Sequence, residues 1–208
     1  MTKEQLDTED KIMEAAKDVF QKKGMSGARM QEIADKAGIN KALLHYYYRT
    51  KEKLFEKVLS GAFSLLIPKA MEMMGSDKPV FEKIRFFVDK YISLILNHPY
   101  IPGFVINELG RNPKLLSDIF EKNIGFERFG LLDKFDEQIK KEVEAGKMIP
   151  IDARTLMVNT ISLCIFPIVA KPIVGTILFN NDQKLYKEFL ERRKTEVADF
   201  IINSIKVK

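Results

Sequence analysis

Residues that carry out chemistry are scarce in this sequence of 208 residues. It has one cysteine, Cys164, two histidines, His45 and His98, and no glycine-rich phosphate loop. General-base and nucleophilic catalysis need partnered groups, and a metal site needs several Cys, His, Asp or Glu ligands at suitable spacing. The sequence shows neither pattern, which argues against an enzyme and predicts no cofactor and no bound metal. A single cysteine also excludes a disulfide within the chain.

Long apolar runs are lacking as well. The most apolar stretch, residues 161–179, is divided by Pro167, Lys171 and Pro172, whereas a membrane-spanning helix needs roughly 20 apolar residues. The first ten residues, MTKEQLDTED, have no apolar stretch of the kind found in signal peptides. We therefore expect a proline-interrupted, buried helix in 161–179, no membrane partner and a location in the reducing cytoplasm.

The composition is that of a folded chain, with 46% hydrophobic and 30% charged residues. Apolar residues recur at helical spacing, and no convincing strand alternation occurs. The pattern predicts an all-α protein of about nine helices. The helices are expected at about 8–24, 30–37, 41–48, from 51 to the methionines at 71, 73 and 74, 79–98, from 113, up to 146, 153–170 and 182–206.

Residues 30–49, MQEIADKAGINKALLHYYYR, have the layout of a helix-turn-helix. Ala34 supplies the small residue that two steeply crossing helices need at their contact, and Gly38 supplies a turn residue that tolerates positive φ. Asn40 precedes the next helix and is a good N-cap. The apolar residues expected to face inward are Ile33, Ala37, Ile39 and Leu44. An ordinary corner between two helices remains the alternative, since that geometry also occurs outside DNA binding.

The charge of this segment favours an anionic partner. No acidic residue lies between Asp35 and Glu52, while the basic residues Lys36, Lys41, Arg49 and Lys51 are all present. His45, Tyr46 and Tyr47 add donors for phosphate oxygens or base edges. Tyr48, four residues after Leu44, is expected in the core. A helical adaptor that binds only protein or lipid is the rival, and the uninterrupted basic stretch argues against it.

The stretch from Lys11 to Leu54 resembles the N-terminal domain of TetR-family transcriptional regulators. The resemblance is carried by F-x-x-K-G at 20–24, I-A-D-K-A-G-I at 33–39, L-H-Y-Y-Y at 44–48 and K-E-K-L-F at 51–55. Tyrosine is usual at the position of His45 in that family, and phenylalanine at the position of Tyr48. The resemblance implies a DNA-binding domain in residues 1–52 and a helical ligand-binding and dimerisation domain in 53–208. It also implies a repressor that an effector releases from DNA.

Roles in DNA binding follow from the resemblance, position by position. It implies that base edges or nearby backbone are approached by Arg29, Gln31, Asn40, Lys41, Ala42 and His45, and that phosphates are bound by Tyr46, Tyr47 and Lys51. Lys51 would add its ammonium to the free N–H groups at the start of a helix. The implied partner is a double-stranded, pseudo-palindromic DNA operator.

The remaining implied sites lie in the second domain. Positions that surround the family's ligand cavity give an effector-binding set of Phe87, Tyr91, Phe104, Asn107, Glu108 and Phe166, with Glu108 as a charged anchor. Core packing is the alternative for each of these aromatics. The expected effector is a small apolar or amphipathic molecule. The helices at 153–170 and 182–206 would form a four-helix interface with a second copy, giving a homodimer.

Overall fold

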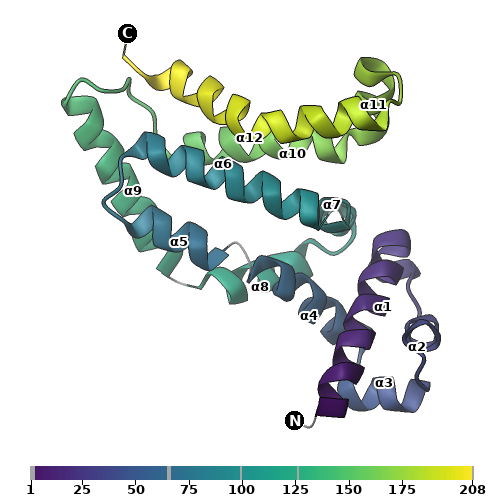
Figure 1. Cartoon of the computed structure of the whole chain (residues 1–208). Coiled ribbons are helices and arrows are strands. Elements are labelled where there is room, and N and C mark those ends of the chain that lie inside the picture. The colour runs from purple at the N-terminus through teal and green to yellow at the C-terminus, as the bar shows by residue number, and fades with distance from the viewer. Residues whose placement is uncertain (1–2, 65–66, 99, 126, 208) are drawn as a thin grey trace. The chain divides into compact units, whose positions relative to one another are not determined.

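The computed structural model describes the backbone of residues 3–64, 67–98, 100–125 and 127–207. Within these ranges the chain is all-α and forms twelve helices (Figure 1). They are α1 Lys3–Gly27, α2 Met30–Ala37, α3 Lys41–Tyr47, α4 Lys51–Phe63, α5 Ile67–Gly75, α6 Val80–Asn97, α7 Tyr100–Arg111, α8 Pro113–Ile124, α9 Glu127–Glu144, α10 Ala153–Val169, α11 Lys171–Phe179 and α12 Gln183–Ile205.

The all-α class is confirmed, whereas the count of about nine helices is wrong. The additional helices are α5, α7 and α11, and each has a proline in its first turn: Pro68, Pro102 and Pro172. Proline fits a first turn because its missing N–H has no partner there, and it disfavours continuation from the preceding helix. α11 accordingly begins as a separate helix, bent by 76° from α10.

The start of the first helix also differs from the sequence expectation. The sequence predicts a start at about residue 8, with Thr8 as the N-cap, but α1 begins at Lys3 and Thr8 lies inside the helix. Strong helix formers precede Thr8, and Asp7 forms an exposed i,i+4 ion pair of 2.6 Å with Lys11. The helix is expected to end at about residue 24; the structure instead has a break there, with Gly24 at φ 66° and ψ 179°, and α1 continues to Gly27.

The chain divides into two compact units, each with its own core. The first unit contains residues 1–64 and 98–123, and the second contains 65–97 and 124–208. In the first unit α1 packs against α2, α4 and α7. Phe20 of α1 and Phe55 of α4 meet edge to face, with ring centroids 5.2 Å apart. Both side chains are buried, as are Ile12, Val19, Ile33, Leu44 and Leu54.

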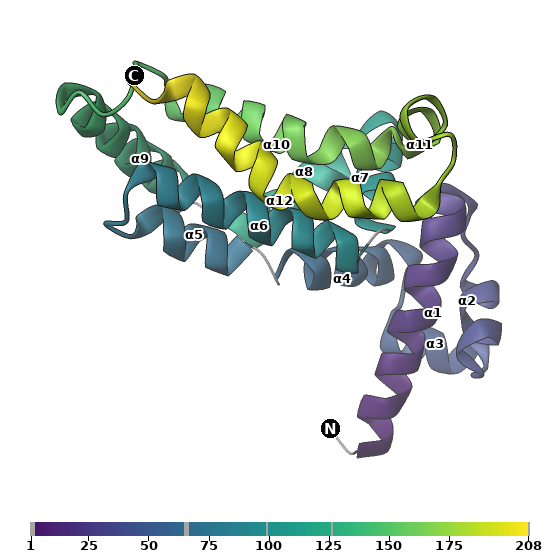
Figure 2. The same cartoon turned by 45° about the horizontal axis from the view of Figure 1, so that its top comes forward.

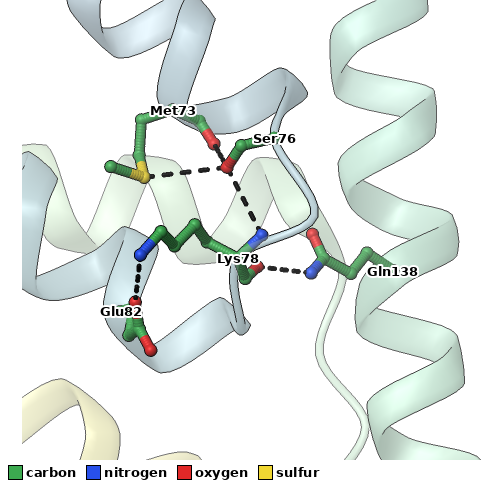
Figure 3. A network of polar contacts seen from close by, with 5 residues as sticks. All are labelled: Met73, Ser76, Lys78, Glu82 and Gln138. Atoms are coloured by element: carbon green, nitrogen blue, oxygen red, sulfur yellow. Dashed lines mark hydrogen bonds and ion pairs between the residues drawn. The ribbon is translucent and has the colours of Figure 1, made fainter.

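In the second unit α6 lies beside α12 and also packs on α5, α9 and α10 (Figure 2). Its buried residues Ile84, Val88 and Ile92 join a core with Phe135, Leu156 and Ile201. Figure 3 shows how the turn between α5 and α6 is tied to α9. Gln138 donates to the Lys78 carbonyl at 2.6 Å, and the Lys78 N–H donates to Ser76 Oγ at 3.4 Å. Lys78 also pairs with Glu82 at 3.3 Å.

α12 compensates for the proline inside α10. Pro167 has no N–H, so the carbonyl of Leu163 lacks its helical donor. Arg193 donates to that carbonyl at 2.5 Å, and the Tyr186 hydroxyl donates to the Pro167 carbonyl at 2.9 Å.

Among the described helices none is by itself long and apolar enough to cross a membrane, and α10 and α11 meet that criterion only as a bent pair.

Candidate functional sites

The turn between α2 and α3 has the geometry that the sequence predicts. Gly38 adopts φ 68° and ψ 30°, the left-handed conformation that glycine adopts without strain. The N–H groups of Gly38 and Ile39 donate to the carbonyls of Asp35 and Ala34 at 3.1 and 3.0 Å, closing the end of α2. Ala34 of α2 and Leu44 of α3 are fully buried, and α2 packs against both α1 and α3. The pair is therefore held in one arrangement.

α3 begins with its first residues in solvent. Asn40 is its N-cap, and its side chain accepts a hydrogen bond of 2.7 Å from the Leu43 N–H. The neighbouring Lys41, Ala42 and His45 are exposed, and His45 Nδ1 lies 3.1 Å from the Arg49 carbonyl. α3 thus exposes an amide at its N-cap, an ammonium in its first turn and an imidazole in its last turn.

The three consecutive tyrosines take different environments. Tyr46 is 77% exposed and Tyr47 is half-buried, with the two rings edge to face at 5.7 Å. Tyr48 is buried, and its hydroxyl donates to Glu9 of α1 at 2.8 Å. Burial and this carboxylate raise the pKa of Tyr48 far above its ordinary value. Tyr46 and Tyr47 can reach a partner, while Tyr48 fixes α3 to the domain.

The start of α2 is more acidic than the start of α3. Arg29 and Gln31 are exposed and line a shallow hollow with Glu32 and Asp35. Gln31 donates to Asp35 at 2.7 Å, and Glu32 forms an ion pair of 2.7 Å with Lys23. Gln31 must give up its contact with Asp35 before its amide can read a base.

The basic residues of 36–51 differ in how far their charges are already paired. Lys36 forms an ion pair of 2.8 Å with Asp18. Lys51 donates to the carbonyls of Ser26 and Ala28 at 3.5 and 3.1 Å. Within the described part of the chain, Lys41 and Arg49 have no ion-pair partner. Their charges are the ones most available to a phosphate.

Of the effector-binding set, Phe87 alone among the described side chains lines an apolar, partly open cavity of the second unit. The cavity measures about 40 Å³, and its walls come from four helices. It is lined by Met74, Lys83, Ile84, Phe87, Phe135, Leu156, Met157 and Thr160. The sequence singles out Met74 and Phe87, but Phe135 and Met157 have the pattern of ordinary core residues.

The other members of that set lie elsewhere. Tyr91 stacks on Phe87 at 5.4 Å and packs into the core, where burial raises its pKa to about 12. Phe166 is 62% exposed. Glu108 belongs to the first unit and is fully buried, bonded to Met25 and Asn112. The side chains of Phe104 and Asn107 lie outside the described residues.

Lys83 is the charged residue on the cavity wall. It is 4% exposed, and its ammonium donates to the carbonyls of Met74 and Ser76, both at 2.7 Å, and to Gln138 at 2.5 Å. Burial lowers its pKa. The ammonium thus holds the C-terminal end of α5 against α9, and the apolar stem of Lys83 faces the cavity.

Among the described residues, no cluster of three or more His, Cys, Asp or Glu side chains could hold a metal ion.

Comparison with known proteins gives one consistent result. The family of bacterial regulatory proteins named tetR matches residues 12–58. RutR of Escherichia coli K12, an HTH-type transcriptional regulator, is 26% identical over 146 residues, which are 70% of this chain and 66% of RutR, about two thirds of its length. YttP of Bacillus subtilis 168, a probable regulator of the same type, is 26% identical over 192 residues, covering 90% of both chains. The crystal structure of HlyIIR, a hemolysin II transcriptional regulator, covers all of both chains at 20% identity with a TM-score of 0.65, a likeness of fold.

Proposed function

The chain belongs to the TetR family of bacterial regulatory proteins, and from this premise we propose that it is a homodimeric, ligand-responsive repressor. In this proposal it binds a pseudo-palindromic operator in the cytoplasm, and a small apolar or amphipathic effector releases it. One observation carries the proposal: a left-handed glycine turn fixes α2 and α3, and the capped start of α3 points exposed polar side chains into solvent.

The proposed DNA contacts follow from exposure. Base edges or nearby backbone would be approached by Arg29, Gln31, Asn40, Lys41, Ala42 and His45, all of which are exposed. Phosphates would be bound by Tyr46, Tyr47 and Lys51. The Lys51 ammonium already donates to the carbonyls of Ser26 and Ala28, so it would bind a phosphate while holding those contacts. Lys41 is the strongest candidate, because no ion pair within the described residues competes for its charge.

The proposed dimer interface is supported by apolar surface on three helices of the second unit. Phe166 and Val158 of α10 and Phe200 of α12 are more than 60% exposed, and so are Ile173, Ile177 and Leu178 of α11. The three helices pack against one another, and exposed apolar side chains gathered on neighbouring helices are typical of an interaction site. A second copy would cover it and would set two copies of α3 about one duplex turn apart.

The proposed effector site is the cavity beside Phe87. Its present volume of about 40 Å³ is far below the roughly 300–1,000 Å³ of small-molecule pockets, so an effector has to displace side chains. Met74 and Met157 on its walls are the adaptable ones. The apolar walls favour an effector that is largely apolar and carries few polar groups.

Selection of bound duplexes from a random library, at physiological salt, tests the proposal. Enrichment of a pseudo-palindrome with half-sites about ten base pairs apart is expected. The amount of duplex that the protein retains should also fall steeply with added salt, because contacts with phosphates release counterions from the DNA. A library with no enrichment at low salt, for protein shown to be folded and dimeric, would contradict the proposal.

A further inference from the structure

The break in α1 leaves one backbone donor that another helix satisfies. In an unbroken helix the Met25 N–H would donate to the Gln21 carbonyl. Gly24 turns the backbone away, and the Met25 N–H donates to Glu108 Oε1 of α7 at 3.1 Å. A helical turn then resumes, with the Ala28 N–H donating to the Gly24 carbonyl at 3.2 Å. The residues Gly24–Ala28, named here the hinge segment, thus depend on α7 at their amide end.

Glu108 is built into this contact. Its side chain is fully buried, and Oε2 accepts a 2.6 Å hydrogen bond from Asn112 Nδ2. The two donors described are the Met25 N–H and the Asn112 amide, and both are neutral. Each of these hydrogen bonds stabilises a carboxylate that is shielded from water. Loss of a partner by a buried charged group is costly. The position of α7 and the position of Met25 are therefore strongly linked.

The carbonyl end of the hinge segment is held by α4. Lys51, the first residue of α4, donates to the carbonyls of Ser26 and Ala28. A carboxylate at the amide end and an ammonium at the carbonyl end match the dipole of a helical turn. α2 begins at Met30, two residues after Ala28. A displacement of the hinge segment is therefore passed directly to Arg29 and to the helix-turn-helix.

We propose that the hinge segment is the point at which the conformation of α7 is transmitted to the DNA-binding helices, with Glu108 as the positioning residue. This inference rests on the proposed function. Only residues 98 and 99 separate α7 from α6, and α6 carries Phe87 on the cavity wall. An effector that displaces α6 would pull on α7, weaken the contact between Glu108 and Met25, and release α2.

Amide hydrogen exchange of the full-length protein, without effector, tests the contact. Glu108→Gln keeps the shape of the side chain and replaces a charged acceptor by a neutral one, which binds an N–H about half as strongly. Exchange at Met25 should become about tenfold faster, equivalent to about 1.4 kcal/mol, and amides of α2 should also exchange faster. Buried amides of α12, such as those of Val197 and Ile201, should keep their rates. Arg111→Gln, an exposed change on the same helix, is the matched control and should alter none of them.

DNA affinity gives the second readout. On the duplex selected with the wild type, Glu108→Gln should bind about three- to tenfold more weakly, because a loosened hinge segment spreads α2 over more positions. Met25→Pro removes the donor itself at a first-turn position that tolerates proline, and it replaces Glu108→Gln if that variant does not fold. The double variant should be no weaker than the weaker single one, since both remove one interaction.

The outcomes separate the two proposals. Unchanged exchange at Met25 in Glu108→Gln, or equal acceleration in α12, would overturn the role of Glu108 as a positioning residue and leave it a core residue. A wild type that enriches no duplex would contradict the proposed function instead. Faster exchange at Met25 together with weaker binding to the duplex supports both.

Discussion

The hydroxyl of Tyr48 shows how a single atom fixes α3, the helix proposed to contact DNA. Burial of Tyr48 could be predicted from its spacing to Leu44. Its partner could not be predicted, because Glu9 lies 39 residues away in sequence and nothing in a local pattern specifies such a contact.

Tyr48→Phe removes this hydroxyl and leaves the ring. We expect the free energy of unfolding to fall by about 1–2 kcal/mol, since the lost hydrogen bond ends on a half-buried carboxylate. Urea unfolding followed by circular dichroism measures the change. Tyr46→Phe is the matched control, because that ring is 77% exposed, and it should change stability by less than about 0.5 kcal/mol. Equal effects of the two variants would show that the bond to Glu9 contributes nothing.

Charge availability distinguishes the lysines of the basic segment. Lys41→Ala should weaken binding to the selected duplex and reduce the magnitude of the slope of log affinity against log salt by about 1, as expected when one phosphate contact is lost. Lys36→Ala is the control, since Asp18 already pairs with that ammonium at 2.8 Å. Titration by fluorescence anisotropy at several salt concentrations measures both. A salt slope unchanged by Lys41→Ala would exclude Lys41 from the phosphate contacts.

At the scale of elements, local rules predict the beginnings and ends of helices well where a cap or turn residue acts alone. The side chains of Asn40, Asp152 and Asp182 each accept hydrogen bonds from the first N–H groups of α3, α10 and α12. Prediction fails on the helices that begin at a proline: the division of 51–74 at Pro68 is not predicted, and the interruption at Pro172 is predicted without the separate helix α11 that follows it. Apolar periodicity continues across such a break, whereas the backbone does not.

The α2–α3 turn gives the test at this scale. Gly38→Ala places a side chain on a residue at φ 68°, and although no atom lies within 4 Å of the added carbon, the backbone conformation itself is strained. We expect a loss of about 1–2 kcal/mol in the free energy of unfolding. Gly61→Ala in α4, where the added carbon also meets nothing within 4 Å and φ is not positive, should stabilise by up to ~1 kcal/mol. Thermal unfolding of both variants measures the contrast, and a stabilised Gly38→Ala would exclude a strained turn.

At the scale of the whole molecule, the sequence predicts the two units less well than their helices. The first unit includes residues 98–123, which follow 33 residues of the second unit, 65–97. A linear reading cannot anticipate this return of the chain, because contacts such as that of Glu108 with Met25 join residues 83 positions apart. For the same reason the sequence places Glu108 among effector contacts, while the structure directs both of its oxygens to the first unit. The boundary between a DNA-binding domain in 1–52 and a ligand-binding domain in 53–208 divides the chain by function, and it stays a prediction.

The exposed aromatic residues of α10 and α12 are the test of the proposed dimer interface. Phe200 is 66% exposed on a helix whose opposite face is buried against α6, so Phe200→Glu should leave the fold intact and place a carboxylate in the proposed interface. Burial of an unpaired charge there is unfavourable, and sedimentation at micromolar concentration should show a monomer that melts cooperatively. Leu6→Glu changes an equally apolar residue on α1, 51% exposed, and should keep the wild-type assembly. If Phe200→Glu remains a dimer, the α10–α12 surface is not the interface; if it becomes a folded monomer, its affinity for the full pseudo-palindrome should fall close to that for a half-site, since one copy of α3 reads one half.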